Sequence, residues 1–108
     1  MSQTIWGDAG SGNGAATLTN YPVTITATSQ QILGANVARR SLEIQNNHAT
    51  EDIFVNFGAA ATVGNGVRIR ALNNRANAEP IKFPTPPSNT VNIIAAGTNN
   101  AVIVTEGT

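Results

Sequence analysis

The chain has 108 residues, of which 41% are hydrophobic and 11% are charged, and its six basic and six acidic side chains give a formal net charge of zero. This length fits one domain with one modest core, and the sparse, balanced charge excludes the clustered Lys and Arg of a nucleic-acid-binding surface. The absence of cysteine excludes disulfides, zinc–thiolate sites and iron–sulfur clusters.

Residues 1–20 differ in composition from the rest of the chain. Residues 7–14 are glycine and small side chains, which lose much backbone entropy on ordering and bring few apolar contacts to offset it. We expect a flexible N-terminal arm over residues 1–20 and a single domain over residues 21–108. No basic segment leads into an apolar one, and no apolar run approaches the ~20 residues that cross a bilayer. We therefore expect no classical secretion signal and no membrane partner.

Ile5 and Trp6 lie near the outer end of this arm and are candidates for a partner interface. An apolar pair on a flexible arm can insert into a pocket of a partner, and Trp is among the residue types most enriched at binding hot spots. The alternative is that Trp6 folds back over the edge of the protein's own core.

From residue 22 onward, apolar and polar residues alternate with a period of two rather than 3.6. This alternation places one face of each strand on a core and is typical of antiparallel sheets. Residues 29–40 are the best helix candidate, but Gly34 interrupts them, so we interpret this stretch as a strand at Gln30–Leu33 followed by a turn. The other strand-like runs are 23–28, 41–45, 52–57, 67–71, 81–83, 91–94 and 101–105.

Turn-forming residues separate these runs. Asn65-Gly66 fits a type I′ hairpin, in which both central residues need positive φ, and residues 46–51 form a polar connection of hairpin length. The proline-rich residues 84–89 cannot continue a strand, because proline lacks the ladder N–H donor. Seven or eight short strands in about ninety residues predict an all-β fold, either an antiparallel β-sandwich or a jelly-roll-like small barrel. We expect residues 53–57 and 102–104 to be core strands.

His48 is the single histidine and lies in the predicted polar loop. Catalysis would need a nucleophile for it to activate, and neither Ser41 nor Ser88 stands in a nucleophile-elbow pattern. Glu51 and Asp52 make a weak set of additional metal ligands. We interpret His48 as a solvated loop residue, and we predict no catalytic residue, no metal site and no cofactor.

The remaining chemical patterns are weaker still. Glycosidase chemistry needs two carboxylates in a shared cleft, and we interpret the six acidic residues as surface groups that flank strands. Residues 10–14 resemble a phosphate-binding glycine loop, but no buried strand precedes them and no helix follows. The acidic residues are Asp8, Glu43, Glu51, Asp52, Glu79 and Glu106.

Two pairs of arginines form the basic clusters, Arg39 with Arg40 and Arg68 with Arg70. Arg68 and Arg70 share one outward face of a predicted strand and are candidate interface residues, since Arg is favoured where proteins meet. The alternative is that they protect an exposed strand from aggregation and pair with a nearby Glu.

Residues 38–106 follow a recognisable order of strands and turns. A strand ending in Asn at 41–47 leads through a polar loop to an Ile-x-Val-x-Phe-Gly strand at 53–58 and an Ala/Thr-rich loop at 60–62. A Gly-apolar-x-apolar strand at 66–69, an apolar strand ending in Ala-Gly-Thr at 91–98 and a closing strand at 102–106 complete it. This order resembles small virion structural proteins of tailed bacteriophages.

The resemblance implies a capsid decoration (cement) protein, which would bind the major capsid protein lattice and stabilise it. Such proteins are typically β-sandwich or jelly-roll domains on the capsid exterior, and often dimers or trimers. We therefore expect a location in the virion after synthesis in the host cytoplasm, the major capsid protein or another virion protein as partner, and a homo-oligomer. A net charge near zero, which favours association, agrees with this, although a neutral surface that is simply solvated would have the same composition.

Two alternative functions remain open. The first is a tail, adaptor or head-fibre component of the same virion. The second is a carbohydrate- or receptor-binding module, which would need an exposed aromatic platform built from Trp6, Tyr21 and Phe54.

Overall fold

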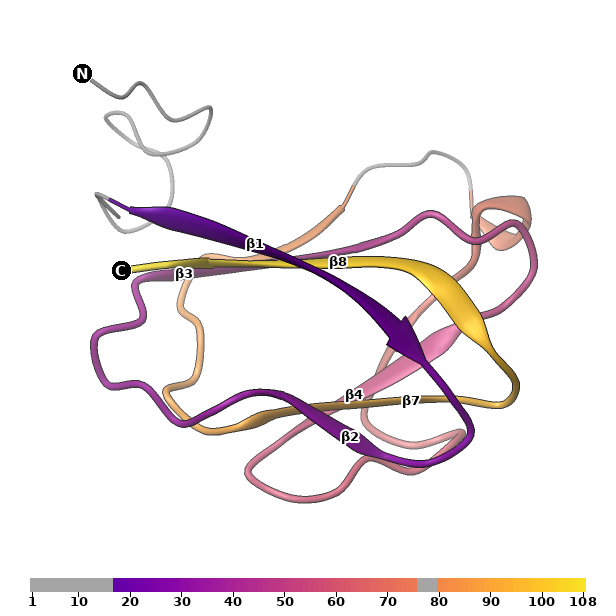
Figure 1. The fold of residues 1–108 in the computed structure, drawn as a ribbon, viewed down its shortest axis with the longest axis horizontal. Helices are drawn as coiled ribbons and strands as arrows, with labels where there is room; N and C mark the ends of the chain where they lie inside the picture. Colours follow the sequence, from indigo (N-terminus) through magenta and orange to yellow (C-terminus); the bar gives the residue numbers. More distant parts are fainter. Residues whose placement is uncertain (1–16, 76–79) are drawn as a thin grey trace.

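A computed structural model of the chain describes residues 17–75 and 80–108, and over these residues it forms two antiparallel four-stranded sheets packed as a sandwich (Figure 1). An N-terminal arm is expected over residues 1–20. Residues 1–16 of it lie outside the described residues, and the first strand begins at Leu18. The elements are β1 (Leu18–Ile25), β2 (Gln30–Leu33), β3 (Ser41–Asn46), β4 (Ile53–Phe57), β5 (Val67–Ile69), the 3₁₀ turn η1 (Leu72–Asn74), β6 (Ile81–Phe83), β7 (Val91–Ala95) and β8 (Asn99–Gly107).

The strand order is β1-β8-β3-β6 in the first sheet and β2-β7-β4-β5 in the second. Among these strands, only β4 and β5 are both consecutive in the chain and paired with each other. The other connections cross between the sheets. The prediction that residues 46–51 form a hairpin is therefore wrong, because they carry the chain from β3 in the first sheet to β4 in the second.

Apolar side chains from the inner faces of both sheets fill the space between them, as the period-two pattern predicts. The core strands expected at residues 53–57 and 102–104 are confirmed: Ile53 and Val55 of β4 and Val104 of β8 are fully buried, and Val102 is nearly so. Where the two sheets meet along one side, Phe57 and Phe83 contact each other edge to face, with ring centroids 5.6 Å apart. The predicted strand at Gln30–Leu33 is also confirmed.

The β4–β5 connection is longer than the predicted tight hairpin. The two strands pair, but residues 58–66 join them, and among the described residues positive φ occurs at glycines alone. Asn65 therefore cannot be the first central residue of a type I′ turn, and that prediction is wrong. The connection instead folds over the outer face of the second sheet, where Ala61 packs with Phe54 and Ile94 in a small second cluster.

Candidate interaction surface

Arg39 is buried at one end of the sandwich and joins three parts of the chain. Its guanidinium donates from Nε to Glu106 Oε2 at 2.8 Å, and its side chain is 0% exposed. Nη1 donates to the carbonyl oxygens of Pro87 and Asn89, at 2.6 and 2.8 Å, and Nη2 donates to that of Gly34 at 2.9 Å. One side chain thus cross-links the β2–β3 loop, the β6–β7 loop and strand β8.

These two cross-linked loops form the walls of a groove of about 430 Å³, which we call the end groove. Val37 and Arg40 of the β2–β3 loop line it, together with Thr85 and Pro86 of the β6–β7 loop and Thr108. Val37 is 94% exposed. Because a buried guanidinium holds both walls in place, the groove is formed before any partner arrives.

The described chain begins beside this groove. Thr17 and Thr108 exchange two backbone hydrogen bonds, from Thr17 N to Thr108 O at 3.2 Å and from Thr108 N to Thr17 O at 2.9 Å. Residues 1–16 therefore join the sandwich at the same end as the groove. Ile5 and Trp6 themselves lie outside the described residues.

Arg68 and Arg70 are both exposed, as expected, but their surroundings differ. Arg68 donates two hydrogen bonds to Asp52 Oδ2, from Nε at 2.9 Å and Nη2 at 2.6 Å, and its guanidinium carbon lies 5.8 Å from the Phe54 ring centroid. Its acidic partner is thus an Asp rather than the Glu considered from the sequence. Arg70 makes no hydrogen bond or ion pair within residues 17–75 and 80–108.

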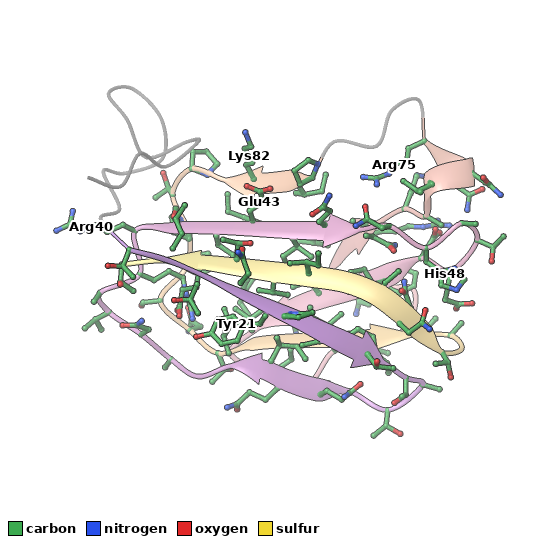
Figure 2. All side chains as sticks on the ribbon, turned by 45° about the horizontal axis from the view of Figure 1, so that its top comes forward. Tyr21, Arg40, Glu43, His48, Arg75 and Lys82 are labelled. Atoms are coloured by element: carbon green, nitrogen blue, oxygen red, sulfur yellow. The ribbon has the colours of Figure 1, made fainter. Side chains whose placement is uncertain are left out.

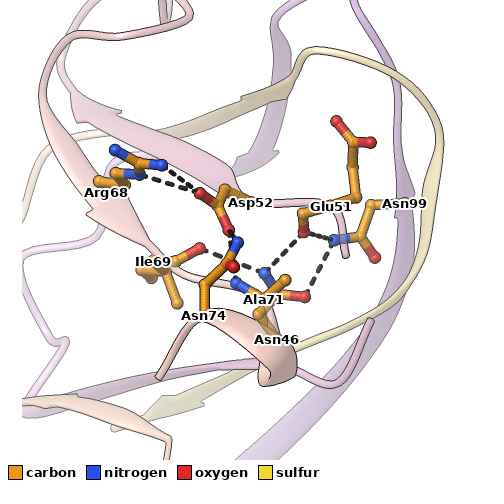
Figure 3. A network of polar contacts seen from close by, with 8 residues as sticks. All are labelled: Asn46, Glu51, Asp52, Arg68, Ile69, Ala71, Asn74 and Asn99. Atoms are coloured by element: carbon orange, nitrogen blue, oxygen red, sulfur yellow. Dashed lines mark hydrogen bonds and ion pairs between the residues drawn. The ribbon is translucent and has the colours of Figure 1, made fainter. Parts of the chain in front are cut away.

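Asp52 is the centre of a polar network (Figure 3). The network lies between the end of β3 and the start of β4, at the opposite end of the sandwich from the end groove. Burial alone would raise the pKa of its carboxyl group, but hydrogen bonds from the Ala71 backbone N–H and the Arg68 and Asn74 side chains, with the Arg68 charge, lower the pKa below its ordinary value. The carboxylate thereby fixes the start of η1 against β4 and β5.

Two buried asparagines complete this network. The Nδ2 atoms of Asn46 and Asn99 both donate to the Glu51 carbonyl, at 3.0 and 2.9 Å, and Asn99 Nδ2 also donates to Asn46 Oδ1 at 2.9 Å (Figure 3). Asn46 Nδ2 reaches the Ile69 carbonyl of β5 at 3.2 Å. Asn46 of the first sheet is therefore hydrogen-bonded directly to the second sheet.

His48 stabilises its own loop. Its Nδ1 accepts hydrogen bonds from the backbone N–H groups of Thr50 and Glu51, at 3.1 and 3.0 Å, and its carbonyl accepts from Leu72 N at 2.9 Å. His48 is half-buried, so it stays partly in contact with solvent as expected, and its ring also forms hydrogen bonds within the loop. Figure 2 shows it at the opposite end from Arg40.

Glu51, Glu43 and Ser41 lie beside backbone or side-chain groups of the sandwich itself. Glu51 Oε1 accepts from Gly97 N at 2.8 Å, and Glu43 lies opposite Lys82 on neighbouring strands (Figure 2). Burial raises the pKa of Glu43, and the Lys82 charge only partly offsets this. Ser41 Oγ is buried. No three His, Cys, Asp or Glu side chains in the described part of the chain are placed to share a metal ion.

No family model, curated protein or solved structure matches the chain. The structure alone therefore establishes what is known of its class, a small all-β two-sheet sandwich. Within the described residues, no helix is long and apolar enough to span a membrane.

Sequence reasoning missed the role of Arg39. It grouped Arg39 with Arg40 as a basic cluster, whereas the structure buries Arg39 and exposes Arg40. Only one signal was available from the sequence: Glu106 in the last strand is one of few acids in a chain with few charges. Pairing the two requires knowing that the β2–β3 loop lies beside β8, which follows from the sheet order and from no local pattern.

Proposed function

We propose that the protein is a non-catalytic structural component of a tailed-bacteriophage virion, a capsid decoration protein that binds the exterior of the major capsid protein lattice. The observation that carries this proposal is the end groove: a preformed, partly apolar surface held by a buried guanidinium, at the end where residues 1–16 join the sandwich. A rigid surface loses little conformational entropy on binding, so more of its contact energy appears as affinity.

The free strand edges favour association through ends and loops rather than by strand addition. β1 is long but contains Pro22, which lacks the N–H needed to pair with an added strand. β6 is three residues long and lies between Pro80 and Pro84, β5 is also three residues long, and β2 has four. A subunit with such edges can be crowded on a lattice without forming continuous sheets with its neighbours.

The carbohydrate-binding alternative loses support from the position of Phe54. Phe54 is only 8% exposed, because it packs with Ala61 and Ile94 and the Arg68 guanidinium lies over its ring. A sugar-binding platform needs an accessible aromatic face, and Phe54 does not offer one. Of the two platform candidates among the described residues, Tyr21 alone is exposed.

The test is cosedimentation of the purified protein with expanded, DNA-filled phage heads and, as a control, with unexpanded proheads. Binding to expanded heads alone, at a fixed ratio to capsid subunits, is the expected result. Deleting residues 1–16 is expected to reduce occupancy while the sandwich still unfolds cooperatively. Absence of binding to both head forms would refute the decoration role and leave a tail, adaptor or head-fibre component, which imaging of the particle would locate.

A further inference from the structure

The end groove presents apolar surface without an apolar cover. Val37 is 94% exposed beside Pro86, although most large apolar side chains of the described chain lie in the core. Arg39 bonds one wall of the groove at Gly34 and the other at Pro87 and Asn89, so the two walls are held in place by the same buried side chain. Covering the apolar part of this surface, which includes Val37 and Pro86, is favourable at roughly 25 cal/mol per Å² removed from water.

The N-terminal segment starts at the rim of this groove. Thr17 is hydrogen-bonded to Thr108, and Thr108 lines the groove. Residues 7–16 separate Trp6 from Thr17, and glycine-rich chains of this length have a root-mean-square span of roughly 16–19 Å. Trp6 can therefore reach the groove of its own chain, where short linkers give effective concentrations in the mM range.

We propose that the end groove binds Ile5 and Trp6 of the chain's own N-terminal segment. The indole would lie against Val37 and Pro86. Figure 2 shows Arg40 at this end of the sandwich. The inference concerns the isolated subunit and uses the same end groove that supports the proposed virion role, so a docked segment would cover or form part of the surface offered to a capsid partner. The fluorescence test below needs no capsid, so its failure can be told apart from failure of the cosedimentation test.

The test uses Trp6 fluorescence in the full-length chain, because Trp6 is the single tryptophan. Emission maximum and acrylamide quenching are measured for the wild type, for Val37→Asp and for the control Val63→Asp. Val63 is also an exposed loop valine, but it does not line the groove. The expected wild-type signal is blue-shifted and protected from quenching. Val37→Asp is expected to lower the ratio of docked to undocked segment about tenfold, equivalent to about 1.4 kcal/mol, whereas Val63→Asp leaves it unchanged.

Three results would overturn the proposal. The first is a wild-type emission spectrum typical of a fully solvated indole, and the second is an equal response to Val37→Asp and Val63→Asp. The third is protection that disappears on dilution, which would assign the groove to the segment of a second copy. Thermal unfolding of each variant checks that the sandwich is intact, and Pro86→Ser provides a second groove variant that is expected to act in the same direction as Val37→Asp.

Discussion

Replacing Arg39 by Met is expected to destabilise the sandwich more than any substitution of an exposed arginine. The change keeps an apolar stem of similar length but removes the donors to Glu106 and to three backbone carbonyls. Glu106, 11% exposed, then retains a poorly solvated charge. Removing one partner of a buried ion pair costs about 3–5 kcal/mol, a large part of the roughly 5–15 kcal/mol that stabilises a domain.

At about 4 °C per kcal/mol for a chain of this size, Tm should fall by roughly 12–20 °C, as measured by circular dichroism or calorimetry. Arg70→Met is the matched control, because Arg70 is exposed, and it should change the free energy of unfolding by no more than about 0.5 kcal/mol. Adding Glu106→Gln to Arg39→Met should restore part of the loss. A loss below about 1 kcal/mol for Arg39→Met, or no recovery in the double variant, would show that the pair does not hold the loops together.

Three further predictions concern single sites. Glu43→Gln should raise stability at neutral pH, because burial raises the pKa of Glu43, and the stability that the native carboxyl contributes at low pH is lost as pH rises through that pKa. Urea unfolding at several pH values should show that the advantage of Gln disappears in acid. Asp52→Asn should show the opposite dependence: the native pKa is lowered, so the wild-type advantage present above the ordinary Asp value should shrink as pH falls through the lowered pKa. Gly66→Ala should lower Tm, because Gly66 has φ +82° and an added Cβ would lie 2.5 Å from the Val55 carbonyl oxygen. Gly34→Ala is the control, because a Cβ added at Gly34 meets no atom within 4 Å.

The period of two in the sequence located most strands, because a half-buried strand must alternate to keep one face on the core. It failed for the first part of β1, where Thr19, Asn20 and Tyr21 are all exposed at a sheet edge and no alternation is required. It also could not assign strands to sheets. A short polar connection such as residues 46–51 serves a hairpin or a crossing between sheets equally well, and only the packing of the two inner faces selects between them.

The candidate site was predictable in its composition and not in its geometry. The sequence marked Trp6 as a candidate contact residue and residues 84–89 as a break between strands, but the groove arises because the β2–β3 and β6–β7 loops meet over Arg39. These contacts span 48 and 50 positions of the chain for the two carbonyls of the β6–β7 loop. Side-chain contacts at such separations follow from the sheet order, which no local pattern encodes.

The two ends of the sandwich differ in a way that bears on which one meets a partner. At the end that holds Asp52, the Arg68 charge is matched, the carboxylate accepts several hydrogen bonds, and the buried asparagines satisfy each other and the neighbouring carbonyls. Covering that end would remove water from polar groups and return little. At the other end Arg39 donates hydrogen bonds beneath the surface to Glu106 and to three backbone carbonyls, and what faces outward includes Val37. Burial therefore favours binding at the end groove.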